Sequence, residues 1–205
     1  MNFFVIDSPV MRFLGRIGDI IILNLIFVMT SLPLVTVGTA LSALYTVSMK
    51  LAKGEDPSVL REYIRAFRRN IKPATICWLI MAAAGALIFV DFRMAGAFGG
   101  MAYTVIRLLL AVIFGVWILT FLYLFPYIAR FENTVFHSFK NALFLSAAHL
   151  PSTVMMLVIS VGLAVITLFT SRTFVIGTIV WFFAGFAAVA YIQSFLLARI
   201  FSRYE

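Results

Sequence analysis

Charged residues are scarce in this sequence of 205 residues, and their scarcity excludes an ordinary soluble domain. Only 12% of the residues are Asp, Glu, Lys or Arg, while 63% are hydrophobic and the mean hydropathy is +1.08. Soluble domains carry about 25% charged residues because their surfaces must be hydrated. A soluble chain this apolar would expose patches that aggregate. Most of the surface must therefore face a medium other than water, which indicates an integral membrane protein.

Cysteine and histidine are also nearly absent, and this limits the possible chemistry. Cys77 is the single cysteine, which excludes an intramolecular disulfide and a metal site with several cysteines. His137 and His149 have no carboxylate beside them and form no His-x-x-x-His pair. We therefore predict that the protein is not an enzyme and holds no cofactor and no metal.

Long stretches without Asp, Glu, Lys or Arg predict the membrane helices, since a span needs about 20 apolar residues. The second, third and fifth stretches predict one span each. The fourth begins with an amphipathic part and predicts a span at about 151–170, with Arg172 in a turn before the last span. These stretches are residues 20–49, 73–90, 108–129, 141–171 and 173–198.

The first stretch is too long for one span, because thirty helical residues reach about 45 Å and the hydrocarbon core is about 30 Å thick. Pro33 removes a helical hydrogen-bond donor and restricts Leu32. We therefore expect a Pro-broken hairpin of residues 10–30 and 37–52, which either crosses fully or is re-entrant. The prediction is an all-α, polytopic transmembrane helical bundle of about six membrane helices, formed by residues 1–205 as a single domain.

The distribution of basic residues predicts the orientation of this bundle. With six membrane helices and both termini in the cytoplasm, 13 of the 16 Lys and Arg residues lie inside. Five spans would instead place 11 inside and 5 outside. Since cytoplasmic loops are enriched in Lys and Arg, the six-helix arrangement with both termini in the cytoplasm is favoured.

Two segments on the cytoplasmic side have the pattern of amphipathic helices. The first should begin at Asp56-Pro57, an acidic N-cap followed by proline, and the second covers residues 133–145. In the first, Val59, Leu60, Tyr63, Ile64 and Phe67 form an apolar stripe, which predicts a helix lying in the membrane interface. Its opposite face should contact anionic lipids or a protein partner through Arg61, Arg65, Arg68, Arg69 and Lys72.

Two parts of the chain share short sequence matches. Leu41-Ser42-Ala43-Leu44-Tyr45 is similar to Leu119-Thr120-Phe121-Leu122-Tyr123, and a Phe-basic-Asn pattern follows each. These matches suggest a parallel pseudo-repeat of residues 37–92 and 104–170.

Polar residues in the first hairpin are candidates for a site, because ionisable groups inside a membrane are costly and usually functional. One interpretation is structural: Arg16 pairs with Asp19, and Asn24 bonds across helices. The other is a polar site at the broken turn, which includes Thr39, with Gln193 and Asp91 facing it. The candidate residues are Arg16, Asp19, Asn24, Ser31, Pro33, Thr36 and Gly38.

The same residues carry a resemblance to a known family. Gly18-Asp19, Asn24, the run from Ser31 to Gly38 and Leu44-Tyr45 are similar to the signature of the bacterial YesL family. Lys140-Asn141 and His149-Leu150-Pro151 extend the resemblance. Its members have no assigned activity and are often encoded beside carbohydrate transporters and sensors. The resemblance implies an accessory protein of the bacterial cytoplasmic membrane whose partner is a carbohydrate transporter or sensor. The alternative is a small-solute transporter. No feature predicts nucleic-acid binding.

Overall fold

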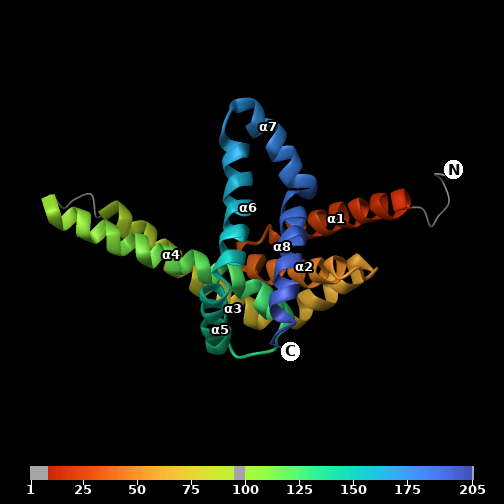
Figure 1. Ribbon diagram of the computed structural model, residues 1–205, viewed down its shortest axis with the longest axis horizontal. Coiled ribbons are helices and arrows are strands. Elements are labelled where there is room, and N and C mark those ends of the chain that lie inside the picture. Colours follow the sequence, from red (N-terminus) through yellow and green to blue (C-terminus); the bar gives the residue numbers. More distant parts are fainter. Residues whose placement is uncertain (1–8, 95–99, 205) are drawn as a thin grey trace.

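The computed structural model describes residues 9–94 and 100–204, and the regular structure of these residues is entirely helical (Figure 1). A short 3₁₀ turn, Leu34–Thr36, precedes α2, and a π-helical segment, Trp181–Gly185, joins α7 to α8. The α-helices are α1 (Pro9–Ser31), α2 (Val37–Ala52), α3 (Val59–Met94), α4 (Gly100–Arg130), α5 (Val135–Ala148), α6 (Leu150–Leu168), α7 (Ser171–Val180) and α8 (Phe186–Phe201).

Six helical stretches are long and apolar enough to cross a membrane. They correspond to α1, α2, α3, α4, α6 and the continuous stretch of α7, the π segment and α8. The all-α bundle with six membrane helices is thus confirmed, and the chain is a multi-pass membrane protein.

The predicted break in the first apolar stretch is present at Pro33. α1 ends at Ser31, and the 3₁₀ turn is closed by the Thr36 backbone N–H, which donates to the Pro33 carbonyl at 2.9 Å. The Thr36 hydroxyl donates to the carbonyls of Thr30 and Pro33 at 2.7 and 2.8 Å. These bonds satisfy backbone groups that the interrupted helix leaves without intrahelical partners. The hairpin of α1 and α2 is confirmed.

The first amphipathic segment differs from the prediction in two ways. It is not a separate helix, because α3 runs without interruption for 36 residues through Pro73 and into the third span. It also does not begin at Asp56-Pro57, because the first helical residue is Val59 and Asp56 lies in the preceding loop. Proline is tolerated within membrane helices where neighbouring groups satisfy the freed carbonyl.

The second amphipathic segment is present as α5, as predicted. The turn expected at Arg172 is not, because Arg172 lies in the first turn of α7.

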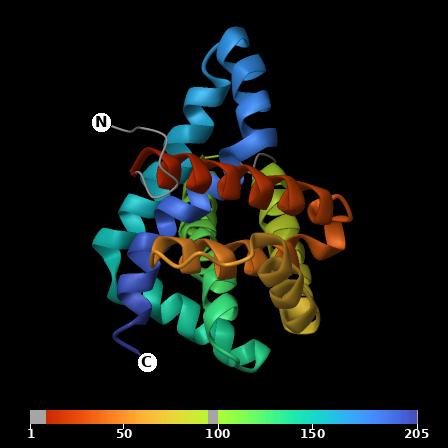
Figure 2. The same ribbon diagram turned by 90° about the vertical axis from the view of Figure 1, so that its right-hand side faces the viewer.

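Two helical hairpins project from a common core in different directions (Figure 1). One consists of the outer parts of α3 and α4, and the other of α6 and α7. The two ribbon views agree that α1 and α2 lie beside each other at the core, next to α8 (Figure 2). Helices α1 and α2 are therefore part of the core from which both hairpins extend.

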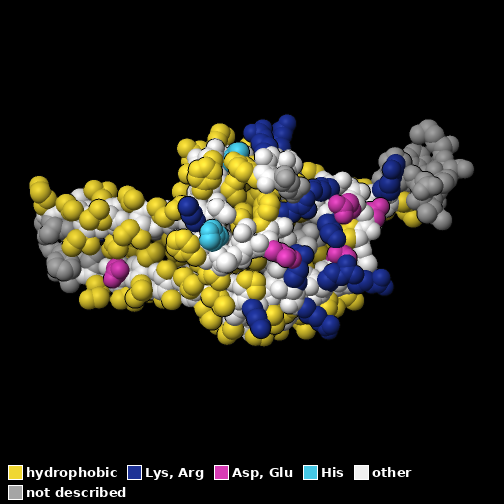
Figure 3. Space-filling model, turned by 90° about the horizontal axis from the view of Figure 1, so that it is seen from below, with side chains coloured by type: hydrophobic (Ala, Val, Ile, Leu, Met, Phe, Trp, Pro, Cys, Tyr) yellow, Lys and Arg dark blue, Asp and Glu magenta, His cyan; other side chains and the backbone are white. Residues whose placement is uncertain are grey.

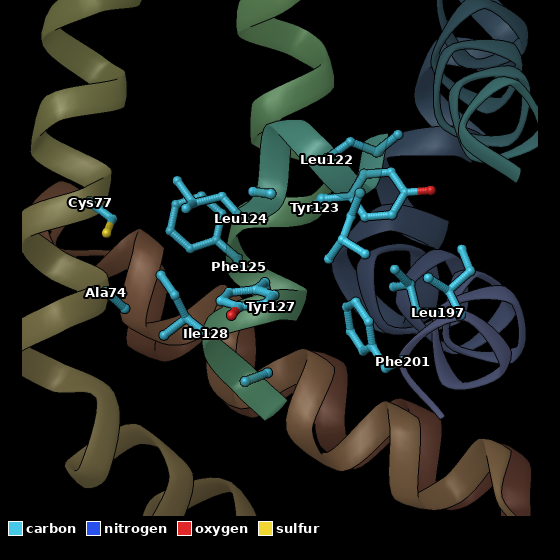
Figure 4. Close-up of a cluster of buried hydrophobic side chains, with 14 of the residues drawn as sticks. Ala74, Cys77, Leu122, Tyr123, Leu124, Phe125, Tyr127, Ile128, Leu197 and Phe201 are labelled. Atoms are coloured by element: carbon cyan, nitrogen blue, oxygen red, sulfur yellow. The ribbon is translucent and has the colours of Figure 1, made fainter. Parts of the chain in front are cut away.

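The core has two hydrophobic clusters. The larger lies around the C-terminal half of α4, where side chains from α3 and α8 approach it (Figure 4). The smaller lies among α1, α2, the first turns of α3 and the start of α8, and includes Leu23, Phe27, Leu44 and Tyr63. Within the apolar stripe of α3, Val59 and Tyr63 are buried in this cluster, whereas Leu60 and Ile64 are exposed, so one part of the stripe packs against protein and the other stays at the surface.

Candidate functional site

The predicted polar residues of α1 do not form one site. Arg16 lies near the start of α1, where its guanidinium donates to the carbonyl of Glu55 at 2.9 Å and to Asp56 Oδ1 at 3.2 Å. The expected Arg16–Asp19 pair is therefore replaced by an ion pair with the α2–α3 loop. Asp19 faces the same region without a hydrogen bond to any described residue. Since Ser31 is 15 positions further along α1, about 22 Å at 1.5 Å per residue, the two ends of the candidate set are well separated.

Asn24 bonds across helices to the π segment of the last span. Its Nδ2 donates to the carbonyls of Trp181 and Phe182 at 3.1 and 2.7 Å, and its Oδ1 accepts from the backbone N–H of Ala187 at 2.9 Å. A π-helical turn displaces the regular i to i+4 pairing and leaves backbone groups available. Asn24 is fully buried and satisfies them. The amide thus joins α1 to the last span at its irregular turn.

At the broken turn, the predicted residues serve packing and turn closure. A Cβ on Gly38 would lie 2.5 Å from the Cβ of Trp78 and 2.6 Å from the carbonyl oxygen of Ala74, so only glycine permits this approach of α2 to α3. Pro33 precedes the 3₁₀ turn. The buried hydroxyl of Ser31 has no hydrogen-bond partner among the described residues.

The other residues expected to face the turn are dispersed. The Thr39 hydroxyl is hydrogen-bonded to that of Thr75 at 2.9 Å, between α2 and α3. Asp91 is exposed on the outer part of α3. Gln193 is buried, and it belongs to a different group of residues at the centre of the core.

A chain of hydrogen bonds connects three membrane helices at this centre. The Tyr45 hydroxyl on α2 donates to Gln193 Oε1 on α8 at 2.6 Å. Gln193 Nε2 donates to the Ser160 hydroxyl on α6 at 2.7 Å and to the Met156 carbonyl at 3.3 Å. Because both Gln193 N–H groups are used, the chain presents acceptor oxygens rather than free donors.

This hydrogen-bonded chain lines a cavity of about 230 Å³. Its other walls are apolar and strongly aromatic, with Phe121 and Phe125 from α4, Trp181 from the π segment and Phe186 from α8. Trp181 also borders a second, almost wholly apolar hollow of about 430 Å³ between α6 and the last span. Pockets that combine apolar walls with a few convergent polar groups are typical of small-molecule sites. The central cavity combines these two features and is therefore a candidate small-molecule site.

Tyr45, Ser160 and Trp181 were not among the predicted site residues. Tyr45 was noted for its place in the pseudo-repeat and in the family resemblance, but not as a site residue. Ser160 lies alone in an apolar span, and its hydroxyl also donates to the Met156 carbonyl on its own helix, as serine in a helix commonly does. The available signal was that polar residues within spans face protein rather than lipid.

The basic face of α3 is exposed, as its pattern predicts. Arg61, Arg65, Arg68, Arg69 and Lys72 all lie at the surface. Glu62 between them accepts from Lys50 at 2.7 Å and from Arg65 at 2.8 Å, and Arg69 donates to the Ala129 carbonyl at 3.3 Å. Figure 3 shows Lys and Arg side chains interspersed with acidic ones over the core end of the molecule, while hydrophobic side chains predominate on the projecting α3–α4 hairpin, with an acidic one among them.

The chain is similar to a known protein family and to a curated protein. Residues 20–92 match the model of a family described as "Protein of unknown function, DUF624". A curated relative, "Uncharacterized protein YesL" from Bacillus subtilis (strain 168), is 24% identical over 155 residues, which are 75% of this chain and 73% of that protein. The predicted YesL-family resemblance is confirmed. No solved structure matches the chain significantly.

The family match covers the C-terminal half of α1, all of α2 and nearly all of α3. This part of the chain contains Asn24, the broken turn and Tyr45. It therefore includes Asn24, through which α1 bonds the π segment, and Tyr45, through which α2 lines the central cavity. The contributions from α6 and α8 lie outside the family match and within the C-terminal part of the chain.

Proposed function

We propose that this YesL-like chain is a non-enzymatic accessory protein of the bacterial cytoplasmic membrane that assists carbohydrate uptake or its sensing. The carbohydrate context comes from the family resemblance alone. The structural observation that carries an accessory role is the α3–α4 hairpin, which projects from the core as an arm (Figure 1) and exposes apolar side chains. Large side chains exposed on this arm include Leu87, Phe89, Val90, Leu108, Leu109 and Val112.

Such an arm suits association with helices of another membrane protein. Membrane helices associate through packing and interhelical hydrogen bonds, and the arm offers the surface of two helices that are covered by little of their own chain. The buried polar groups also favour this role over transport. Both side-chain N–H groups of Asn24 and of Gln193 already donate to protein oxygens, so neither residue offers a free donor to a passing solute.

Co-purification from gently solubilised native membranes tests the proposal. The tagged wild-type protein should recover components of a carbohydrate transporter or sensor. The double variant Phe89→Ala, Leu109→Ala should recover much less, because it removes apolar surface from the arm. The control variant Val158→Ala, Val161→Ala should recover as much as wild type, because both positions are more than half exposed but lie on the other hairpin. Recovery of no transporter or sensor component by the wild type would contradict the proposal.

The central cavity favours a second candidate function, a small-solute transporter. Its aromatic walls and acceptor oxygens suit a small molecule that carries a hydroxyl or other donor. Solute flux into proteoliposomes separates the two functions. An accessory protein alone should give no flux, whereas a transporter should give flux that falls with Gln193→Leu, because this change removes the central link of the hydrogen-bonded chain.

A further inference from the structure

The beginning of α1 lines a hollow of mixed charge that neither candidate function uses. Its charged residues on α1 recur at a spacing of three or four, which places them on one face of the helix. Gly15 lies between them and leaves the space open. The loop between α2 and α3 closes the opposite side. The hollow has a volume of about 400 Å³ and is lined by Arg12, Gly15, Arg16, Asp19, Gly54 and Asp56.

Two of the four charged groups form an ion pair with each other, and the other two have no ion-pair partner among the described residues. Arg16 and Asp56 form an ion pair at 3.2 Å, and the Glu55 carbonyl fixes the guanidinium further. Arg12 and Asp19 form no hydrogen bond or ion pair with any described residue. The hollow thus presents one guanidinium and one carboxylate, placed on either side of Gly15 along the same helix face.

The hollow lies next to a surface that suits hydrocarbon. Phe13, Leu14 and Ile17 are exposed on the remaining sides of the same turns of α1, Phe13 by 66%. These turns begin the first stretch apolar enough to cross a membrane. Figure 3 shows basic and acidic side chains intermixed at this end of the molecule. A ligand here would therefore have its charged part in the hollow and apolar surface beside it.

We propose that the hollow binds the headgroup of a zwitterionic phospholipid with a primary ammonium group, of the phosphatidylethanolamine type. Arg12, with the ion-paired Arg16 behind it, would bind the phosphate, since guanidinium groups match phosphate oxygens in pairs. Asp19 would accept hydrogen bonds from the ammonium. The two guanidinium groups and two carboxylates balance, as the charges of this headgroup do. The acyl chains would lie along Phe13 and Ile17.

The charge pattern selects against the other common headgroups. A choline headgroup has the same charges, but its quaternary nitrogen has no N–H to donate to Asp19. An anionic glycerol headgroup satisfies Arg12 but brings its negative charge towards Asp19, which repels it. Preference between lipids, rather than binding of phosphate alone, is therefore the property that distinguishes this site.

Lipid competition in nanodiscs, read by native mass spectrometry of the released protein, tests the proposal. Wild-type protein in equal mixtures of ethanolamine and choline phospholipids should retain the ethanolamine lipid in roughly tenfold preference, as expected for hydrogen bonds to a charged group. Asp19→Asn should reduce this ratio to near one. Arg12→Gln is exposed and should not disturb folding; it should lower retention of both lipids. Lys140→Gln on α5 serves as the matched charge control and should behave as wild type.

Three outcomes would overturn the assignment. Equal retention of both lipids by the wild type would remove the preference, as would an unchanged ratio in Asp19→Asn. Stronger retention of an anionic glycerol phospholipid would show that positive charge alone selects the lipid. Soluble glycerophosphoethanolamine, added as competitor, should displace the lipid poorly, because it lacks the acyl chains. Displacement as strong as that by intact lipid would assign the hollow to a soluble phosphate compound instead.

Discussion

Helices α2 and α6 are both long and apolar enough to cross a membrane, yet the rest of the chain covers them very differently. In α2, 61% of the most apolar stretch is buried within the protein, against 11% in α6. The mean hydropathy runs the opposite way, 1.3 for α2 and 2.1 for α6. The less hydrophobic helix is thus the more deeply buried one. Inside a membrane this order is expected, because lipid is as apolar as leucine and does not drive apolar side chains inward.

The side chains of the two helices explain the difference. α2 carries small and hydroxylated residues that bring neighbouring helices close, and the Ser42 hydroxyl accepts from Asn70 of α3 at 2.8 Å. α6 presents large apolar side chains outward, among them Val154, Val158, Val161 and Val165, each more than half exposed. Substitutions of the same kind should therefore have unequal effects in the two helices.

The largest effect is expected for Gly38→Ala in α2. The added Cβ would meet the Cβ of Trp78 and the backbone oxygen of Ala74, neither of which can rotate away. Overpacking of this kind costs roughly 1–3 kcal/mol, and we expect the upper end. The melting temperature in detergent measures it. Gly162→Ala in α6 is the control, because nothing lies within 4 Å of its added Cβ. Equal melting temperatures for the two variants would contradict the comparison.

Next in size is Asn24→Leu. The variant removes three hydrogen bonds and leaves the carbonyls of Trp181 and Phe182 without this partner. Interhelical hydrogen bonds in membranes contribute about 0.6–2 kcal/mol each, so a loss of about 2 kcal/mol is expected. Denaturant unfolding in mixed micelles gives the value. Thr178→Ala, whose hydroxyl bonds only within its own helix, should change it little. An unaltered stability of Asn24→Leu would mean that the π segment does not depend on α1.

A smaller effect is expected for Tyr45→Phe, which removes only the hydroxyl that donates to Gln193. The cost should be about 0.6 kcal/mol, the average for such bonds in membranes, and thermal unfolding should show a slightly lower midpoint. Tyr191→Phe on α8 is a suitable control, since the Tyr191 hydroxyl has no hydrogen bond to the described residues. If both variants unfold like wild type, the chain of bonds at the cavity adds no stability.

The smallest effect is expected for Ser48→Ala in α2. The Ser48 hydroxyl is buried without a partner among the described residues. Removing a buried unsatisfied group is neutral or stabilising by up to about 1 kcal/mol. An unchanged or slightly raised melting temperature is therefore expected. A clear fall would show that the hydroxyl has a partner in the membrane-embedded protein, such as water.

The sequence predicted local features of this fold well. The hairpin at Pro33 was predictable because proline and a 30-residue apolar stretch together exceed what one helix can accommodate. The continuity of α3 was not, since Pro73 gives the same local signal as Pro33 and only the packing of Asn70 and Ala74 against α2 and α4 distinguishes them. Proline alone does not decide whether a membrane helix ends.

The site was harder to predict because its contacts are distant in sequence. Asn24 was recognisable as a buried polar residue, but its partners lie more than 150 positions away. Arg16 was expected to bond one turn along its own helix, and it bonds Asp56, 40 positions away. The pattern of one helix shows which residues need a partner, whereas only the folded bundle shows which residue supplies it.

The π segment has a consequence for the direction in which the last span faces. In a π-helical turn the backbone hydrogen bonds join residues five apart instead of four, so the turn contains one more residue than an α-helical turn. Every residue after Gly185 is therefore rotated by about 100° relative to an uninterrupted helix. This phase shift turns Gln193 towards Tyr45 and Ser160. Deleting one residue from Trp181–Gly185 would keep the span long enough to cross the membrane but would point Gln193 at lipid, so the central cavity depends on a single position of register.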